Sequence, residues 1–401
     1  MAREVWITGI GLASSLGEGT DAHFAAFAET DRPTPNVDLA FAPPFGIHPL
    51  VALDLDTQIP KKSDQRQMEP WQRLGVYAAG LALADAGIAG NADILSHTHA
   101  VVAADGGERD VPADTAILEG LGSADPKAAF LNERLSNDLR PTLFLAQLPN
   151  LVAGNISIVH KVTGSSRTFM GEEIAGVSAA EIAWRRIGAG QGDIFLVGGA
   201  CLAERKDSVL NIALGGRLWA GAHLPVWERL EKGGGAMLGS AGAFIVLEAR
   251  EHAEARGRAP YARLAQVRSD QSRRRPGDVT AKMTRQFDEI APEGGAPVTV
   301  LSAATGVAEA TGEERDRLAA WIREGRVDAV RATASMFGAT TSATFPAATA
   351  LAALALRRGR LPKPFDATGL ETPATAPPAR IVVTSIGIWR GEGMALIEAV
   401  G

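Results

Sequence analysis

The sequence has very little cysteine, because Cys201 is the only one in 401 residues. A single thiol excludes a disulfide framework and is typical of a reducing compartment. An excess of charge of one sign is also missing: 40 basic residues stand against 46 acidic ones, which leaves a net charge of −6. That balance offers nucleic acid no general attraction.

Long hydrophobic runs are absent as well. The longest apolar stretch, residues 343–356, is interrupted by Pro346 and is too short to span a bilayer. The amino terminus lacks a basic region followed by an apolar core and a cleavage site. We therefore expect a cytoplasmic protein with no membrane span and no targeting segment. A chain of 401 residues, 46% of them hydrophobic, can bury about three quarters of its unfolded surface.

Strand patterns alternate with helix patterns along the chain. In the first half they predict strands at 4–8, 100–103, 168–170, 194–197 and 243–247, and helices at 69–86 and 174–189. In the second half they predict strands at 261–267, 298–301, 381–384 and 394–398, and helices at 313–322 and 347–356. Such alternation favours an α/β protein with parallel sheets covered on both faces. We expect two halves, 1–250 and 251–401, and a loop excursion over 36–59, which is rich in proline and aspartate.

Residues 166–200 carry the clearest local pattern. After a short strand, apolar residues recur at spacings of three and seven, as one buried helix face requires: Ile174, Val177, Trp184 and Ile187. A glycine cluster at 188–192 ends the helix, and the apolar run 194–197 fits a strand buried on both faces. The unit is strand, helix, strand.

Four separated segments resemble, in order, the β-ketoacyl-acyl-carrier-protein synthases, which are the condensing enzymes of fatty-acid and type II polyketide synthesis. They are VWITGIGLASSLGEG at 5–19, LPVWERLEKGGGAMLGSAGAFIVLEAREHAEARG at 224–257, SMFGATTSATFPAATALAALAL at 335–356 and TSIGIWRGEG at 384–393. The resemblance implies the thiolase fold: two similar halves in five layers, helix, sheet, helix, sheet, helix.

The resemblance also locates the family's nucleophile. A gap-free match of the segment, anchored on Gly176 and on the glycines at 198–199, places Glu173 where the family carries its cysteine, with Glu172 as the near competitor. In the family, the helix N-terminus favours the attacking thiolate. A carboxylate there cannot form a useful acyl-thioester. The alternative interpretation is that an acidic residue simply suits a helix N-terminus.

The family's histidines and lysine are missing too. The two histidine positions correspond to Ala304 and Ala339, and the lysine position to Ala334. The family's histidines hydrogen-bond the thioester carbonyl and stabilise the enolate, an arrangement worth about 3 kcal/mol per donor. The alanine side chains end in methyl groups, which donate no hydrogen bond. In the same gap-free match, the threonines that grip the carrier's pantetheine arm become Gly306 and Ala308. In the closing motif, three residues replace the family's phenylalanine and two glycines and fill space that the family leaves open near the nucleophile: Ile388, Trp389 and Arg390.

Other candidate sites are weaker. Cys201 lies just past a predicted strand, where a small buried residue is the more common interpretation. Ser178 has no histidine in matched positions. His97 and His99 form an H-x-H pair that would share one strand face and could bind a metal, although no third ligand is apparent. Five histidines are scattered: His23, His48, His160, His223 and His252.

Two short runs of one residue type do not indicate a single function. Gly233, Gly234 and Gly235 are not followed by the lysine of a phosphate loop. Arg273, Arg274 and Arg275 form a basic patch, which is either a solvated loop or a contact for an acidic carrier protein.

The resemblance implies partners. Synthases of this family dimerise through the edge strand before the nucleophile helix, here about 165–170, which presents unpaired backbone groups. Chain-length factors resemble synthases but lack the nucleophile, and commonly carry glutamine there. We therefore expect a degenerate homologue that acts, as homo- or heterodimer, beside an active synthase and an acyl carrier protein. No cofactor and no metal are expected, and the phosphopantetheine of an acyl carrier protein is a possible ligand. Alternatives are an acyltransferase with relocated residues, using Glu173 or Cys201, and a homodimeric acyl- or carrier-binding protein.

Overall fold

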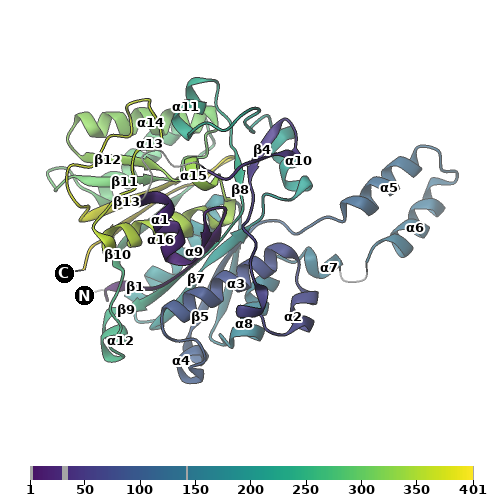
Figure 1. Ribbon diagram of the computed structural model, residues 1–401, viewed down its shortest axis with the longest axis horizontal. Coiled ribbons are helices and arrows are strands. Elements are labelled where there is room, and N and C mark those ends of the chain that lie inside the picture. Colours follow the sequence, from purple (N-terminus) through teal and green to yellow (C-terminus); the bar gives the residue numbers. More distant parts are fainter. Residues whose placement is uncertain (1–2, 29–34, 141–142, 401) are drawn as a thin grey trace.

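The computed structural model describes residues 3–28, 35–140 and 143–400, which form a layered body with one projecting pair of helices (Figure 1). Within these residues, two blocks of five strands share one internal order, β6-β5-β7-β9-β1 and β12-β11-β13-β14-β10. The bounds of the first block are β1 (Val5–Ser14), β5 (His99–Ala104), β6 (Ser166–Met170), β7 (Ile194–Cys201) and β9 (Ala241–Ala249). Those of the second are β10 (Ala262–Asp270), β11 (Val298–Ser302), β12 (Val327–Ala332), β13 (Arg380–Ile386) and β14 (Glu392–Glu398).

The strand directions also repeat. In the first block β6, β5 and β7 are parallel, and in the second β12, β11 and β13 are parallel. The two remaining strands of each block are antiparallel to their neighbours. The blocks join where β1 pairs with β10 at Trp6 opposite Arg263 and Ile7 opposite Ala262. Every strand expected from the sequence is present, and β12 is an additional one.

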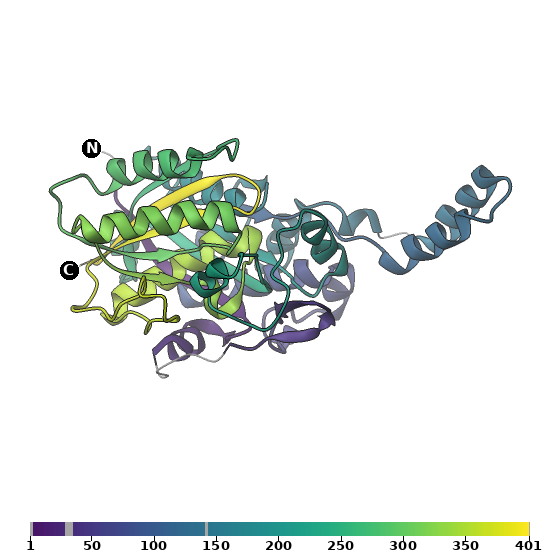
Figure 2. The ribbon, with the colours of Figure 1, turned by 90° about the horizontal axis from the view of Figure 1, so that it is seen from above.

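Two helices lie between the blocks. Helices α9 (Glu173–Gly188) and α16 (Thr344–Arg358) pack against each other and against strands of both blocks. Helices α3 (Pro70–Asp85) and α8 (Leu151–His160) cover the outer face of the first block, and α13 (Asp278–Ile290) and α14 (Ala308–Arg323) cover that of the second (Figure 2). The layers are therefore helix, sheet, helix, sheet, helix, which confirms the expected thiolase fold.

The crossing of α9 and α16 depends on small residues. Gly176 of α9 faces Pro346 and the Ser342 carbonyl so closely that an added Cβ would lie 2.8 and 2.9 Å from them. Helix α16 begins three residues before the expected start at 347, and Pro346 lies in its first turn. Amide groups there have no intrahelical acceptor, so a proline costs little.

The prediction of a loop over 36–59 is wrong in part. It contains the hairpin of β3 (Asp38–Ala42) and β4 (Phe45–His48), followed by the short 3-10 helix η1 (Leu55–Thr57). β4 pairs in parallel with β8 (Leu238–Gly239), through His48 opposite Gly239. Because the partner strand is about two hundred residues away in sequence, the local pattern could not indicate it.

The remaining elements are short or lie in loops. Helices α5 (Val111–Leu121) and α6 (Lys127–Asp138) form the projecting pair, which the sequence did not predict (Figure 1). The others are α1 (Gly19–Ala28), β2 (Gly17–Glu18), α2 (Lys62–Gln67), α4 (Ala92–His97), α7 (Leu143–Ala146), α10 (Lys206–Leu214), α11 (Val226–Glu231), α12 (Arg250–Ala255), α15 (Ala334–Phe337) and η2 (Thr341–Ala343). Among the described residues, no helix is both long and apolar enough to cross a bilayer.

The close approach at Gly176 gives a stability prediction. Gly176→Ala should lower the free energy of unfolding by about 1–3 kcal/mol, because its methyl group would force the two central helices apart. The matched control is Gly312→Ala in α14, where an added Cβ meets nothing within 4 Å. That variant should gain up to about 1 kcal/mol from helix propensity. Denaturant unfolding of both variants is the measurement, and a Gly176→Ala protein as stable as the parent would contradict the packing described.

Candidate functional site

The candidate site lies where the carboxyl ends of the parallel strands of both blocks meet. In the first block, Asp105 follows β5, the segment from Glu172 to Glu173 follows β6, and Cys201 ends β7. In the second, residues 303–307 follow β11, 333–343 follow β12 and 387–391 follow β13. The two sets touch: the Thr341 hydroxyl donates to the Asp105 carboxylate at 2.5 Å. Crevices at such strand ends are where α/β proteins bind ligands.

A strained bend places Glu173 at the start of α9. Glu172, immediately before it, has φ 60° and ψ −138°, a conformation that a residue with a side chain adopts at a cost of about 1–3 kcal/mol. The bend turns the chain from β6 directly into the helix. Glu173 becomes the first helical residue and is only 1% exposed.

The Glu173 carboxyl is enclosed without a hydrogen-bond partner. Neither of its oxygens makes a hydrogen bond within the described residues. The amides of Glu173 itself and of Ile388 lie near enough to favour the charged form slightly, but they are not aligned to bond it. Burial, and then the Glu172 and Asp105 carboxylates, raise the pKa of Glu173 to about 8. Glu173 is therefore mainly a neutral carboxylic acid at pH 7.

Arg274 holds the 387–391 loop in place over Glu173. Its guanidinium donates to the carbonyls of Gly387 (2.7 Å) and Gly391 (3.3 Å) and pairs with the Glu392 carboxylate at 3.0 Å. A Cβ on Gly387 would lie 2.9 Å from a Glu173 carboxyl oxygen, so the loop that Arg274 holds is the lid over Glu173. Of the two interpretations of the arginine run, the solvated loop is wrong for Arg274, because its side chain turns inward.

The alanines matched to the family's histidines and lysine lie in apolar surroundings. Ala339 and Ile388 belong to one buried cluster with Ile47, Leu238 and Val307. Ala304 and Ala334 belong to a second buried cluster, which extends to the outer helices of the second block. All three alanines are at most 3% exposed. The buried members of the cluster that contains Ala339 are all aliphatic.

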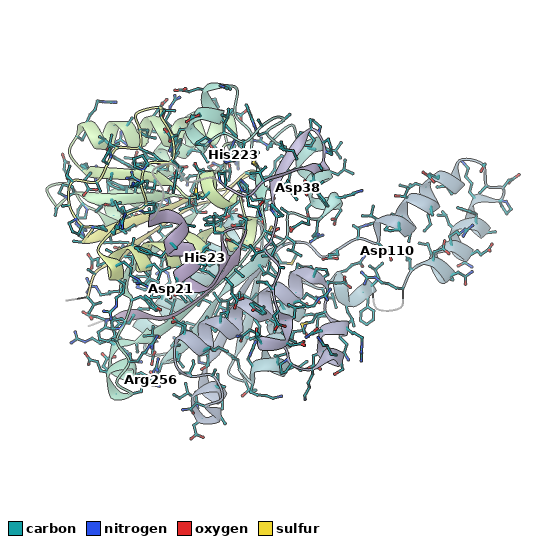
Figure 3. All side chains as sticks on the ribbon, in the orientation of Figure 1. Asp21, His23, Asp38, Asp110, His223 and Arg256 are labelled. Atoms are coloured by element: carbon teal, nitrogen blue, oxygen red, sulfur yellow. The ribbon has the colours of Figure 1, made fainter. Side chains whose placement is uncertain are left out.

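Two histidines that the sequence analysis left scattered lie together beside this region. The rings of His48 and His223 meet edge to face with centroids 5.4 Å apart, and His223 Nε2 lies 3.0 Å from the Ser335 carbonyl (Figure 3 labels His223). Burial lowers the pKa of His48 to about 3, and among the described residues neither of its ring nitrogens makes an aligned hydrogen bond. His48 is thus neutral at physiological pH.

A cavity of about 520 Å³ opens between the strand ends. Its wall includes acidic, thiol, hydroxyl and apolar side chains, among them Asp105, Glu172, Cys201, Thr341, Ile388 and Trp389. Burial, followed by the charge of Asp105, raises the pKa of Glu172 to about 7. Of the described residues that line the cavity, none is a histidine. The closing-motif residues Ile388 and Trp389 do occupy the wall, as expected.

Cys201 is the last residue of β7, not just past the strand as expected. It lines the cavity beside Asp105, and burial followed by that carboxylate raises the pKa of its thiol. Thiolate is the nucleophilic form of cysteine. The surroundings of Cys201 therefore disfavour attack on an acyl group.

The remaining candidates do not assemble into sites. His97 ends α4 and His99 begins β5, so the expected shared strand face is wrong. Within the described ranges, no group of three metal-ligating side chains comes together. Gly235 packs against Trp219, where an added Cβ would meet backbone atoms at 2.6 Å. The glycine run is a packed turn.

Comparison with known proteins identifies the class. The family model described as "Beta-ketoacyl synthase, N-terminal domain" matches residues 2–253. The chain therefore belongs to the β-ketoacyl synthase family. It is 27% identical over 284 residues to 3-oxoacyl-(acyl-carrier-protein) synthase 2 of Rhizobium meliloti, a match that covers 65% of this chain and 63% of that protein. The chain thus spans slightly less than two thirds of the length of this relative.

Solved structures agree on the fold. The chain matches the structure titled "The ishigamide ketosynthase/chain length factor" with a TM-score of 0.77 and 19% identity, over 100% of both chains. It matches a β-ketoacyl synthase from Burkholderia phymatum with a TM-score of 0.80 and 18% identity, again over 100% of both. At these identities the likeness concerns the fold alone.

The buried carboxyl gives a pH prediction. Glutamate in the unfolded chain titrates near 4.5, whereas Glu173 in the folded chain titrates near 8. The folded state therefore holds the extra proton between these values, and stability falls as pH rises through that window, by about 1.4 kcal/mol per pH unit from this group. The contribution is complete below pH 4.5 and is lost above about pH 8.

Glu173→Gln should remove this slope, because an amide does not titrate. Denaturant unfolding between pH 5 and 9 measures the difference between the parent and the variant. The control is Glu309→Gln, whose side chain is 81% exposed and which should leave the pH dependence unchanged. A Glu173→Gln protein with the parental slope would show that Glu173 is ionised in the folded chain.

Proposed function

We propose that this chain is a non-condensing subunit of a β-ketoacyl synthase system, acting beside an active synthase in fatty-acid or polyketide synthesis on an acyl carrier protein. One observation carries the proposal. At the position matched to the family nucleophile, Glu173 is a buried, neutral carboxylic acid under a lid held by Arg274.

Condensation needs a nucleophile that can carry an acyl group and a donor pair for the carbonyl oxygen. A protonated carboxyl is a poor nucleophile, and Glu173 has almost no exposed surface from which to attack. Ala304 and Ala339 supply no donor, and each missing donor of this kind typically costs about 10²–10³ in rate. Decarboxylation of a malonyl group loses the same support.

The neutral state of Glu173 brings it close to glutamine. A protonated glutamate presents one carbonyl acceptor and one O–H donor on the same carbon skeleton that carries the glutamine amide. Chain-length factors of the family commonly carry glutamine at this position. The chain thus departs from them in residue type but little in shape or hydrogen bonding, which supports a chain-length-factor-like role.

Under this proposal, the carrier's phosphopantetheine arm binds at the active site of the partner synthase. The positions matched to the family's gripping threonines are Gly306 and Ala308, which carry no hydroxyl. The Gly306 carbonyl is already bonded by the Gly235 amide at 2.6 Å. These residues do not fit productive binding of the phosphopantetheine arm at this chain's own site. Under the proposal, the active partner therefore binds the carrier.

An acyltransferase with relocated residues has no comparable support. Cys201 faces a carboxylate in place of an imidazole, and its thiol has a raised pKa. Mass spectrometry after incubation with several acyl donors tests this alternative directly. An acyl adduct on Cys201 that disappears in Cys201→Ser would favour it.

A condensation assay tests the main proposal. The purified chain, supplied with malonyl and acyl carrier proteins, should form no β-ketoacyl product and release no carbon dioxide above background. Glu173→Cys should remain inactive, because Ala304 and Ala339 still lack donors. Added to an active synthase that it binds, the parent chain should change the length distribution of the products. Robust condensation by the purified chain alone would reject the proposal.

A further inference from the structure

The cavity between the strand ends is large enough for an organic ligand. Its volume of about 520 Å³ lies within the range of about 300–1,000 Å³ that is typical of small-molecule sites. Large apolar side chains form part of its wall, among them Trp71, Leu202, Ile212, Leu238, Ile388 and Trp389. The non-condensing role proposed above assigns no ligand to this space, so its charged groups are the guide to what it binds.

The basic side chains of the wall are already paired. Arg205 and Asp207 form a two-point ion pair, with Nε to Oδ1 at 3.2 Å and Nη2 to Oδ2 at 2.6 Å. Arg109 Nε donates to an oxygen of Asp114 at 2.8 Å. Each guanidinium therefore has a carboxylate of its own, and the wall offers little attraction to an anionic ligand.

Two acidic side chains of the wall are not paired in this way. The Asp105 carboxylate accepts a hydrogen bond from the Thr341 hydroxyl at 2.5 Å, and this donor carries no charge. The Glu172 carboxyl makes no hydrogen bond with a described residue, and Asp105, Arg390 and Arg274 act on it only through space. Two carboxyls thus line one partly apolar cavity without an ion-pair partner, which favours a cationic ligand.

Trp71 leaves a further polar group of the wall unsatisfied. Its side chain lines the cavity and is only 2% exposed. Among the described residues, no acceptor bonds its indole N–H. Buried indole N–H groups usually have an acceptor, and indole rings also attract cations. The wall is therefore not completed by the chain alone.

We propose that this cavity binds an organic cation, a protonated primary amine on an apolar body. The ammonium group lies at Asp105 and Glu172, where it compensates both carboxyls. The apolar body packs against Leu202, Ile212 and Leu238. This inference goes beyond the proposed function and does not rest on it, since a ligand in the cavity requires neither condensation nor a partner subunit.

Three probes that share one chain and differ in charge test the proposal: octylammonium, octan-1-ol and octanoate. Titration calorimetry of the full chain at pH 8 measures their affinities. Octylammonium should bind at least about tenfold more tightly than either of the others, because only its head group compensates the carboxyls. Octanoate or octan-1-ol that binds as tightly as octylammonium would overturn the inference.

Two variants of Glu172 locate the cation. Glu172→Gln keeps the side-chain shape and removes the charge, so octylammonium should bind at least about tenfold more weakly while octan-1-ol is unaffected. The matched control is Glu293→Gln, an exposed position in the loop before β11, which should bind both probes like the parent. A Glu172→Gln protein with the parental affinity for octylammonium would refute the assigned site.

Glu172→Gly gives a readout that a purely structural side chain would not produce. Glycine adopts the φ of 60° and ψ of −138° at this position without the strain that glutamate bears. The denaturation midpoint should therefore rise while the affinity for octylammonium falls. If Glu172 served only the fold, its removal would lower the midpoint and leave octylammonium binding unchanged.

The parent chain offers a test without substitution. Four charged or titratable groups face Glu172, namely Asp105, Glu173, Arg274 and Arg390, and burial with these neighbours raises the pKa of Glu172 to about 7. Its ionised fraction then increases about tenfold from pH 6 to pH 8, whereas an alkylammonium stays charged. Octylammonium affinity should rise by about the same factor, and the rise should be absent in Glu172→Gln. A flat profile in the parent would contradict the proposal.

A condensation assay on the same preparation separates this inference from the proposed function. A chain that prefers octylammonium and forms no β-ketoacyl product would support both. A chain that prefers octanoate and forms no product would overturn the inference and leave the proposed function standing. A chain that prefers octylammonium and condenses acyl groups would support the inference and reject the proposed function.

Discussion

The buried Glu173 carboxyl is the constraint on which the candidate site depends. An ionised carboxylate without partners cannot be held in an apolar enclosure at neutral pH, so the fold fixes the proton on Glu173. The enclosure includes the 387–391 loop, which Arg274 ties to Glu392.

The two halves of the fold contribute different chemistry to the same place. The strand ends of the first block supply acids and a thiol at Asp105, Glu172 and Cys201, whereas those of the second supply methyl and aliphatic groups at Ala304, Ala339 and Ile388. The repeated strand order brings these groups together, but nothing in that order requires catalytic side chains. The repeated scaffold therefore does not by itself determine which chemistry the strand ends support.

The sequence predicted what local patterns and spaced motifs can encode. Strand and helix periodicity located nine of the ten core strands. The matched motifs led to Glu173 and three alanines, and in the structure these residues follow β6, β11 and β12. It missed the β3–β4 hairpin and the His48–His223 contact, because both depend on residues distant in sequence. It also missed helices α5 and α6, which project from the layered body and bury only Ala113 and Ile117, so the alternation of strands and helices does not include them. Arg274 was misassigned because an arginine run says nothing about which side chain turns inward.

The connection between the body and the projecting helices α5 and α6 has a geometric consequence. Arg205 donates to the carbonyls of Gly106 and Gly107, and these two glycines form part of the cavity wall just before the chain enters α5. One backbone segment therefore both bounds the internal space and carries the projecting helices, so a contact that displaced the helices at their base would also displace part of the wall.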